Sequence, residues 1–545
     1  MQQDSAVHNV MAVNRDPRST SEQLSLDLDI GLTRRDFLGS LLAGFAMSAL
    51  PAAAQSSPSQ NGISLGPMAD RAIPLDYVGL SYETAQLADP AFFAADNREL
   101  ISLFRSLSSQ GVLRIGGNSS EFCWWKTKPD QTAPHMPASS HTDGNWMPQA
   151  FTAIEPIAIN RLAGFLDATG WKAIYGLNLG TGSPERDAEE AAYVARTLGS
   201  RLLYFQIGNE PEYYSDTNNR LRGRDWNFEQ YLAQWTAFAQ AVIQSVPNAR
   251  FGGPDVGSNA DWVIQFAERA PKALPGKIIA CSGHYYAEGP PDSPSTTVER
   301  LLAPDLKFEN ALDRVAATAM QSGLAYRMTE GNTCYRGGKP GLSNAFCSAL
   351  WAADYLLLLA SRGAVGVNLH GGGSQQIRFS LGGHLPGESL APDAAAAAAL
   401  GSFYTPIAGS REAHFSARPV FYGMKVAGLL AGGKMRPVHF DSPPAAARAW
   451  AAEMPSGETR IVVVNKDPQQ DLNLRVPSKD TARLWRLEAP NLSATSSVTL
   501  AGAECGSGSR WQPRQEEHLA TTLGTIAVKI PRASGAIVFL PNTNA

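Results

Sequence analysis

Residues 202–212 read LLYFQIGNEPE, a short apolar run that gives way to polar residues. Runs of bulky apolar side chains without alternation are typical of strands buried on both faces of a sheet. Gly208 and Pro211 are typical of a turn and mark the end of the run, and Asn209 and Glu210 lie between them. We therefore predict a buried strand over residues 202–208 that presents an amide and a carboxyl group where it ends.

Seven further apolar runs are similar to this one, and segments with helical periodicity separate them. They occupy residues 78–82, 112–115, 173–179, 250–254, 277–284, 325–329 and 365–370. The intervening segments 229–246 and 343–361 carry apolar stripes that suit helices packed outside a parallel sheet. Eight strands alternating with helices predict an α/β fold, a (β/α)8 TIM barrel. A doubly wound open sheet is the main alternative, but GGNSS at 116–120 lacks the GxGxxG spacing.

After residue 433 the helical pattern ends and segments of alternating polarity follow. They occupy residues 448–453, 460–465, 471–476, 483–488, 525–530 and 535–540. Such a series, with Pro and Gly between the segments, predicts a β-sandwich. We therefore expect a catalytic barrel over residues 76–432 and a C-terminal β-sandwich domain over 433–545. Residues 55–75 should form a linker and an N-terminal strand that joins the β-domain.

The N-terminal segment carries two arginines, in TRRDFL at 33–38, directly before an apolar run over 38–50. The run ends in small residues, AAA at 52–54, and the whole segment resembles a twin-arginine export signal. The apolar run is shorter than the roughly 20 residues that a membrane-spanning helix needs. We expect residues 1–54 to be a signal peptide and the protein to be periplasmic or secreted, with no membrane span.

Composition and charge exclude some classes of function. The chain has 46 basic and 50 acidic side chains, which argues against a general nucleic-acid binder with a broad basic face. Its five cysteines show no CxxC or His–Cys spacing, so we predict no metal site and no cofactor. The sequence gives no indication of the oligomeric state.

Two glutamates follow the strands in positions that suggest chemistry. Glu210 ends the fourth predicted strand and Glu330 the seventh. In a TIM barrel the carboxyl ends of all strands open onto one face, so these side chains should share a cavity. Cleavage of an acetal needs a proton donor for the leaving oxygen and a second carboxylate opposite it. The pair therefore predicts a glycoside hydrolase; the alternative is two buried acids, each paired with a neighbouring Arg or Lys.

Six motifs in order support this interpretation. They are VGLSYE (78–83), VLRIGGNSS (112–120), FQIGNEPEYY (205–214), CSGHYY (281–286), MTEGNTCYRGG (328–338) and VNLHGGG (367–373). Together they resemble glycoside hydrolase family 79, and the resemblance covers nearly all of the chain after the signal. Members of that family include β-glucuronidases and heparanase-like enzymes, which retain the anomeric configuration.

The resemblance implies a role for each matching position. Glu210 would be the general acid/base and Glu330 the nucleophile, with carboxyl groups about 5 to 5.5 Å apart. The acid/base would be protonated, and the nucleophile ionised, in the resting enzyme. Asn209 would bind the sugar 2-hydroxyl and Tyr286 would hold the nucleophile. Tyr335 and the backbone of residues 332–334, beginning at Asn332, would meet the sugar carboxylate. Arg336 and His370 are the remaining substrate-binding positions.

Other polar and aromatic residues near the same face have two interpretations. Glu83, Glu121 and Glu212 are either pocket acids or ordinary ion-pair partners, and Arg114 is expected to orient a catalytic carboxylate from below. Trp124, Trp125 and Trp146 either stack on sugar faces or pack in the core. Five cations, Arg220, Arg222, Arg224, Arg336 and Lys339, either line the rim for an anionic sugar or form a solvated charge run.

The function that these observations favour is a retaining exo-β-glucuronidase acting on a carbohydrate that contains uronic acid. The alternatives are a β-glycosidase for neutral sugars, an endo-acting heparanase-like enzyme, and a glycan-binding protein without catalysis. The β-domain is either a support for the barrel or an independent polysaccharide-binding module.

Overall fold

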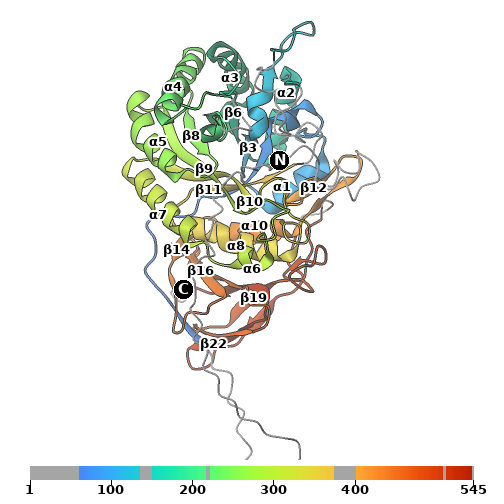
Figure 1. Ribbon diagram of the computed structural model, residues 1–545. Helices are drawn as coiled ribbons and strands as arrows, with labels where there is room; N and C mark the ends of the chain where they lie inside the picture. The colour runs from blue at the N-terminus through green and yellow to red at the C-terminus, as the bar shows by residue number, and fades with distance from the viewer. Residues whose placement is uncertain are drawn as a thin grey trace, which may run out of the picture.

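The computed structural model describes residues 61–135, 150–215, 221–372, 401–506, 508 and 511–542. The expected signal peptide, residues 1–54, lies outside them. A barrel stands on a β-sandwich, with the helices α8 and α10 between the two (Figure 1). In this part of the chain, no helix combines the length and the apolar character that crossing a membrane requires.

Eight parallel strands close the barrel in the order β10, β11, β2, β3, β6, β7, β8, β9. Their bounds are β2 Val78–Glu83, β3 Val112–Gly116, β6 Lys172–Leu177, β7 Leu202–Ile207, β8 Phe251–Val256, β9 Ile278–Glu288, β10 Ala325–Cys334 and β11 Gly366–Gly371. Each contains most of one predicted apolar run, so the predicted fold class is confirmed. The pairing of β9 with β10 shifts register between Met328 and Glu330. A bulge at that point redirects the side chains that follow it.

Helices surround the barrel (Figure 1). They are α1 Arg98–Leu107, α2 Pro156–Thr169, α3 Pro184–Leu198, α4 Phe228–Ser245, α5 Ala260–Ala273, α6 Val298–Leu302, α7 Leu306–Gln321, α8 Phe346–Ser361 and α10 Pro419–Gly428. Side-chain caps begin several of them; for example, the side chain of Asn227 accepts the backbone N–H groups of Glu229 and Gln230 at the start of α4. Such caps fix where each loop above the barrel ends.

Shorter elements lie in the loops that follow the strands. They are η1 Thr84–Ala88, η2 Asn118–Phe122, β4 Cys123–Trp125, β5 Thr152–Ile154, η4 Gly199–Arg201, η5 Pro211–Tyr213, β12 Ile407–Ser410 and β13 His414–Ala417. Two of them, η2 and η5, directly follow strands β3 and β7, where the predicted site lies.

The second domain is built from two sheets, one in the order β15, β1, β18, β22 and the other in the order β14, β16, β17, β23, β19, β20 with β21 beside β19. The bounds are β1 Asn61–Leu65, β14 Lys434–Arg436, β15 Val438–Phe440, β16 Ala447–Glu453, β17 Thr459–Asn465, β18 Leu472–Pro477, β19 Ala482–Glu488, β20 Thr499–Leu500, β21 Glu517–Leu519, β22 Thr525–Ile530 and β23 Ser534–Leu540. All six predicted segments are present. The strand β1 joins the domain from the other end of the chain, pairing with β15 and β18.

Alternating burial explains how the two sheets pack. In β22, Ile526, Val528 and Ile530 are buried, and the side chains between them are exposed. They form a core with residues of the facing sheet such as Ile461 and Val463. This is the packing of a sandwich, in which one face of each sheet is covered.

Helix α8 joins the barrel to the sandwich. All its residues except Ser361 are buried. Its acidic residue, Asp354, accepts hydrogen bonds from Trp450 Nε1 at 2.9 Å and from Lys466 Nζ at 2.8 Å. A buried charge is costly unless it is paired, so these contacts fix the sandwich against the barrel.

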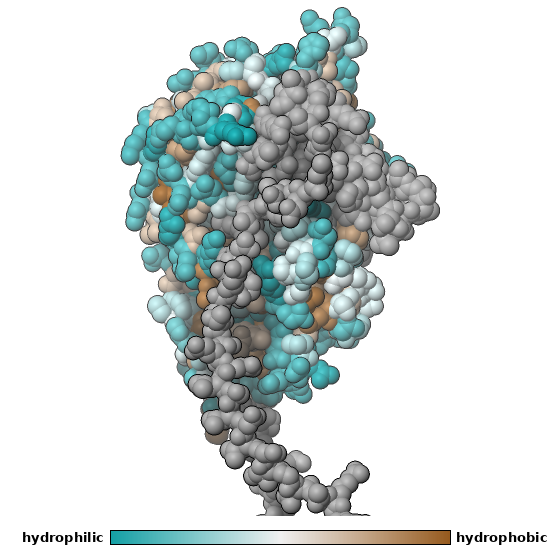
Figure 2. Space-filling view, in the orientation of Figure 1, coloured by the Kyte–Doolittle hydropathy of each residue, from teal (hydrophilic) through white to brown (hydrophobic). Residues whose placement is uncertain are grey.

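On the face seen in Figure 2, hydrophilic and apolar side chains are mixed over the described surface.

Candidate active site

Glu210 and Glu330 meet at the carboxyl ends of their strands. One oxygen of each carboxylate and one ring nitrogen of His284 lie within 4.8 Å of one another. The Glu210 side chain is 18% exposed, whereas that of Glu330 is 8% exposed. A separation of this size matches the arrangement of retaining glycosidases, since inverting enzymes keep their carboxyl groups roughly 6.5 to 9.5 Å apart.

The turn that carries Glu210 has an unusual backbone. Glu210 adopts φ 47° and ψ 50°, in the left-handed region that few residues other than glycine occupy. Its N–H donates to the carbonyl of Asp255 at 2.8 Å, and Asp255 itself has φ 64°. Strained residues of this kind are maintained by their surroundings and cluster at functional sites.

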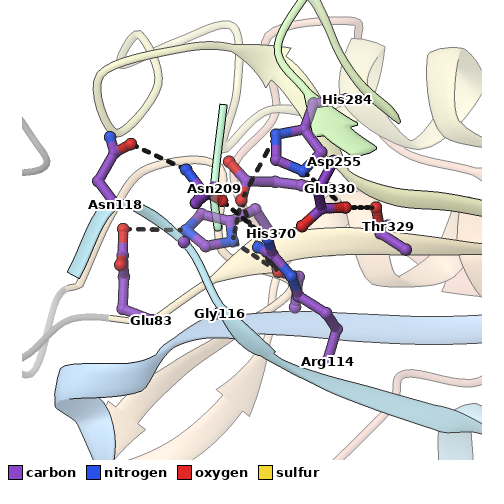
Figure 3. A network of polar contacts seen from close by, with 12 residues as sticks. Glu83, Arg114, Gly116, Asn118, Asn209, Asp255, His284, Thr329, Glu330 and His370 are labelled. Carbon is purple, nitrogen blue, oxygen red and sulfur yellow. Dashed lines mark hydrogen bonds and ion pairs between the residues drawn. The ribbon is translucent and has the colours of Figure 1, made fainter. Parts of the chain in front are cut away.

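Glu330 is held by partners from three strands, of which Arg114 and His370 are labelled in Figure 3. Arg114 Nη1 donates to its Oε2 at 2.6 Å, and the Tyr286 hydroxyl donates to its Oε1 at 2.8 Å. His370 Nδ1 lies 3.7 Å from Oε2. Arg114 and Tyr286 are thus both in contact with the predicted nucleophile.

The same neighbours determine the charge of Glu330. Burial alone would raise its pKa, but the positive charges of His370, His284 and Arg114 and the hydrogen bond from Tyr286 outweigh burial and lower the pKa to about 2. The carboxylate is therefore ionised at neutral pH, which is the state that a nucleophile requires.

Arg114 is a buried guanidinium that connects several groups. Besides Glu330, it donates to Asn209 Oδ1 at 2.7 Å, to Gln206 Oε1 at 3.2 Å and to Asp255. Its side chain is 1% exposed. The neighbouring Gly116 leaves room for it, because a Cβ there would lie 2.4 Å from Arg114 Nε. The small residue at 116 is needed for this side chain to reach both carboxylates.

Asn209 is fixed from two sides. Its Nδ2 donates to Asn118 Oδ1 at 3.0 Å, and its backbone N–H donates to Glu121 Oε1 at 2.6 Å. The other oxygen of Glu121 accepts the backbone N–H of Gly180. Glu121 therefore positions the turn before Glu210. The role of Asn209 toward a sugar hydroxyl stays a prediction.

Two further acids beside this turn hold protons more strongly than usual. Burial raises the pKa of Glu121 to about 7, against the hydrogen bonds from Tyr214 and from the two backbone N–H groups. Burial and the nearby Glu210 carboxylate raise the pKa of Glu212 to about 8. Glu212 Oε1 accepts the backbone N–H of Ser258 at 3.0 Å. Glu121 is buried and Glu212 is half-buried, and both lie near the predicted acid/base.

Two site residues were missed by the sequence reasoning, His284 and Asp255. His284 Nδ1 lies 3.0 Å from Glu210 Oε1, and its Nε2 lies 3.2 Å from Asp255 Oδ1. Burial would lower the pKa of His284, but the charges of Glu330 and Asp255 and hydrogen bonds to Asp255 and Glu210 raise it to about 10. A signal for His284 existed: it lies two residues before Tyr286 on one strand and so faces the same side.

Asp255 occupies the centre of the strand ends. Besides Arg114 and His284, its carboxylate accepts hydrogen bonds from Gln206 Nε2 at 2.5 Å and from the Thr329 hydroxyl. Burial would raise its pKa, but Arg114, His284 and these hydrogen bonds lower it well below the usual range. Asp255 is therefore a permanently ionised group.

His370 lies among the charged groups around Glu330 (Figure 3). Its Nδ1 is 2.9 Å from the Ser81 hydroxyl, and its Nε2 is 3.6 Å from Glu83 Oε1. Glu83 in turn accepts hydrogen bonds from the backbone and the hydroxyl of Ser119, at 2.8 and 2.6 Å. Glu83 is thus a partner of His370 and of the loop after β3.

The loop after Glu330 differs in part from expectation. The Asn332 side chain is fully buried, and its amide donates to the carbonyls of His370 and Tyr404, each at 2.9 Å. The N–H of Thr333 is also taken, by Asn332 Oδ1 at 2.8 Å. Asn332 therefore ties two loops together, and the backbone offers less for a sugar carboxylate than we expected.

Tyr335 and Arg336 lie beside the strand ends. The Tyr335 ring is perpendicular to that of Tyr286, with centroids 6.5 Å apart. The Arg336 guanidinium lies 5.8 Å from the Tyr335 centroid. These residues are close enough to the nucleophile's partner Tyr286 to face a bound sugar, and their binding roles stay predictions.

The expected rim of cations is only partly present. The Arg222 guanidinium donates to the carbonyls of Gly180 and Leu179, at 2.8 and 2.9 Å, so backbone acceptors occupy it. Lys339 Nζ donates to the carbonyl of Thr296 at 2.7 Å. Arg224 is exposed, and Arg220 lies outside the described residues. Arg222 and Lys339 are therefore hydrogen-bonded to backbone carbonyls, which the sequence cannot reveal.

The tryptophans favour the packing interpretation. Trp124 and Trp125 are buried, and Trp125 packs against Tyr193 with ring centroids 5.2 Å apart. Trp146 lies outside the described residues. Neither of the two described rings is therefore assigned to a sugar.

Glu210, His284 and Glu330 have the spacing of a possible metal site. Within this group, His284 Nδ1 lies 3.0 Å from Glu210 Oε1. The donor set suits an ion-pair network. The five cysteines are all buried free thiols.

Comparison with known proteins agrees with this geometry. No family model matches the chain. The β-glucuronidase of Aspergillus niger is 23% identical over 571 residues, covering 92% of this chain and 98% of that protein. The heparanase of Gallus gallus is 23% identical over 334 residues, covering 53% and 61%. The chain is thus similar over nearly its whole length to a β-glucuronidase, and over about half of its length to a heparanase.

Solved structures support the fold. A 4-O-α-L-rhamnosyl-β-D-glucuronidase from Fusarium oxysporum 12S matches with a TM-score of 0.65 at 16% identity, covering 88% of this chain and all of that one. A family 51 arabinofuranosidase from Xanthomonas axonopodis pv. citri matches with a TM-score of 0.57 at 13% identity, covering 88% and 99%. At these identities the likeness concerns the fold.

Proposed function

We propose that this protein is a retaining exo-β-glucuronidase, which releases terminal glucuronic acid from glycans or glucuronides. The observation that carries the proposal is the pair of carboxylates with oxygens within 4.8 Å, one of them held ionised. Relatives named β-glucuronidase support the choice of sugar.

The two carboxylates divide the work between two steps. In the first step, Glu330 attacks the anomeric carbon while Glu210 donates its proton to the departing oxygen. The product is a glycosyl ester of Glu330. In the second step, Glu210 takes a proton from water, and the water oxygen displaces Glu330 from the anomeric carbon. Two inversions at that carbon give net retention.

The surroundings support this division. Glu330 is buried and ionised, and Arg114 and Tyr286 each hold one of its oxygens. Glu210 is more exposed, as a group that exchanges protons with a leaving group and then with water should be. Tyr335 and Arg336, beside Tyr286, are the groups that we assign to the sugar carboxylate.

We also propose export by the twin-arginine route, with residues 1–54 removed. The support is the sequence pattern of two arginines, a short apolar run and a small-residue end. Fractionation of cells that express the full chain, compared with a variant in which Arg34 and Arg35 are Lys, tests this: the mature form should leave the cytoplasm only in the unchanged chain. Equal export of both contradicts the proposal.

The activity is tested with paired chromogenic substrates, a β-D-glucuronide and a β-D-glucoside. We expect release from the glucuronide and at least a 1000-fold loss in Glu330→Gln, since a triad or dyad member typically contributes factors of this order. Glu268→Gln, which changes an exposed acid on α5, is the matched control and should keep full activity. Preference for the glucoside would contradict the proposed substrate. No release from either substrate would favour an endo-acting enzyme or a glycan-binding protein.

A further inference from the structure

Five charged groups from five strands or strand ends converge under the predicted cleavage site. They are Arg114, Glu210, Asp255, His284 and Glu330. The side chains of Arg114, Asp255 and His284 are 0 to 1% exposed. Uncompensated charge at such depth is very costly, so the balance between positive and negative groups is constrained at every stage of a reaction here.

His284 has contacts with three carboxylates. Its Nδ1 lies 3.0 Å from Glu210 Oε1 and 4.0 Å from Glu330 Oε2, so one N–H group faces both reacting carboxylates. Its Nε2 lies 3.2 Å from Asp255 Oδ1. Asp255 is anchored by Arg114, Gln206 and Thr329, so its negative charge stays beside the ring.

Arg114, the other buried cation of this group, has a different set of carboxylate partners from His284. It holds Glu330 at 2.6 Å and also contacts Asp255. Among the residues that the structure describes, His284 is the side chain that forms an ion pair with Glu210. A negative charge on Glu210 is therefore compensated by the imidazolium.

The proposed reaction moves one negative charge between the two glutamates. In the free enzyme Glu330 is ionised and Glu210 carries a proton. In the glycosyl-enzyme Glu330 is a neutral ester and Glu210 is ionised. Arg114 and a protonated His284 then offset the charges of Asp255 and of whichever glutamate is ionised, in both states.

On this basis, and resting on the proposed function, we propose that His284 keeps its proton through the whole cycle and is a positioning residue that serves as counter-charge first to Glu330 and then to Glu210. The imidazolium is not itself a proton donor or acceptor in the reaction. Because its Nδ1 faces both carboxylates, the ring need not move between the two steps.

The charged and titratable surroundings agree with this assignment. The groups that face His284 from the neighbouring elements are Glu210 and Glu212 after β7, Asp255 at β8, Glu330 on β10 and Arg114 on β3, with His370 on β11 beyond Glu330. The negative charges among them outweigh burial and raise the pKa of His284 to about 10. The ring therefore stays charged over the range in which the enzyme would work.

The test compares pH profiles of kcat/KM for the unchanged enzyme and His284→Asn. The Asn amide offers a neutral donor near the position of Nδ1, so the hydrogen bond is kept and the charge removed. Loss of a cation within about 4 Å raises carboxyl pKa values by about 1 unit or more. We therefore expect both limbs of the bell-shaped profile to move to higher pH by about 1 unit. The exposed His414→Asn is the matched control and should leave the profile unchanged.

Three results would overturn the proposal. Limbs that stay in place while the rate falls would mean a structural role. Loss of one limb would mean that His284 itself exchanges the proton. The third is measured on the unchanged protein, so it also covers the case in which His284→Asn does not fold. The ¹⁵N NMR spectrum of labelled histidines should contain one imidazolium signal, assigned with His284→Gln, that does not titrate between pH 5 and 8. A neutral His284 ring would overturn the proposal. This signal is measured without turnover, so it distinguishes failure of this inference from failure of the proposed glucuronidase activity.

Discussion

Both oxygens of Glu121 accept backbone N–H groups, from Gly180 and from Asn209. This residue contacts neither the predicted nucleophile nor the predicted acid/base, yet it determines where the turn with Glu210 lies. At the scale of single residues, the site therefore depends on acceptors that hold backbone as much as on the reacting groups. Arg114 depends in the same way on the empty space over Gly116.

We predict that Glu121→Gln lowers kcat/KM for a glucuronide about 10- to 100-fold, because an amide nitrogen would face one of two backbone donors and displace the turn. An unmet buried hydrogen bond costs about 1 to 3 kcal/mol. Steady-state kinetics measures the loss, and the exposed Glu189→Gln on α3 is the control. Unchanged kinetics in Glu121→Gln would show that the turn is held by other contacts.

Gly116→Ala should lower kcat/KM at least about 10-fold, since the new Cβ would displace the Arg114 guanidinium from Glu330. Without that cation the pKa of Glu330 rises, so the acidic limb of the pH profile should also move upward. Gly506→Ala adds a methyl group in open space and serves as the control. A variant with normal activity and an unshifted limb contradicts this role of Gly116.

At the scale of elements, strand length separates what sequence can predict from what it cannot. The apolar runs predicted all eight barrel strands because buried parallel strands are continuously apolar. Strands β9 and β10 continue past the runs, to Glu288 and Cys334, because the polar residues there bond within the barrel mouth. The two- and three-residue strands β14, β15, β20 and β21 were not predicted, since so few residues carry no periodicity.

The same limit applies to the candidate site. Sequence placed Glu210, Glu330, Arg114 and Tyr286 near one another because strand ends converge in this fold. It could not identify His284 as a partner of Glu210, 74 residues away. Contacts between loops depend on side-chain direction and burial, which neither composition nor spacing contains.

Helix α8 gives a prediction at this scale. The Lys466 side chain is 6% exposed, and Asp354→Leu would remove its carboxylate partner. Breaking a buried pair costs about 3 kcal/mol or more. We expect a lower denaturation midpoint that Lys466→Met added to Asp354→Leu largely restores. No loss in the single variant, measured by urea unfolding, would contradict a role of this pair in joining the domains.

At the scale of the whole molecule, buried acids set the pH dependence of stability. Burial raises the pKa of Glu121 and of Glu190 to about 7 and that of Glu212 to about 8, above their ordinary value of 4.5. The native state therefore binds more protons than the unfolded chain between about pH 4.5 and pH 8, and stability falls as pH rises through this range. Glu330, with its lowered pKa, acts oppositely only below about pH 4.5.

We accordingly predict a melting temperature that falls from pH 5 to pH 8. His284 adds no slope at the start of this range, since its stabilising charge is complete below about pH 6.5 and is lost only as pH rises toward 10. Calorimetry over a pH series measures the fall, and Glu212→Gln should reduce it. A melting temperature that rises from pH 5 to pH 8 would contradict the assignment of these buried acids.

The central claim is that Glu330 is the nucleophile of a retaining β-glucuronidase. It is tested most directly by incubating the protein with a 2-deoxy-2-fluoro-β-glucuronyl fluoride, digesting it and measuring peptide masses. The account predicts one added fluoroglucuronyl group, on the peptide that contains Glu330 and at that residue. Glucuronide turnover without any label, or a label on another carboxylate, would contradict it.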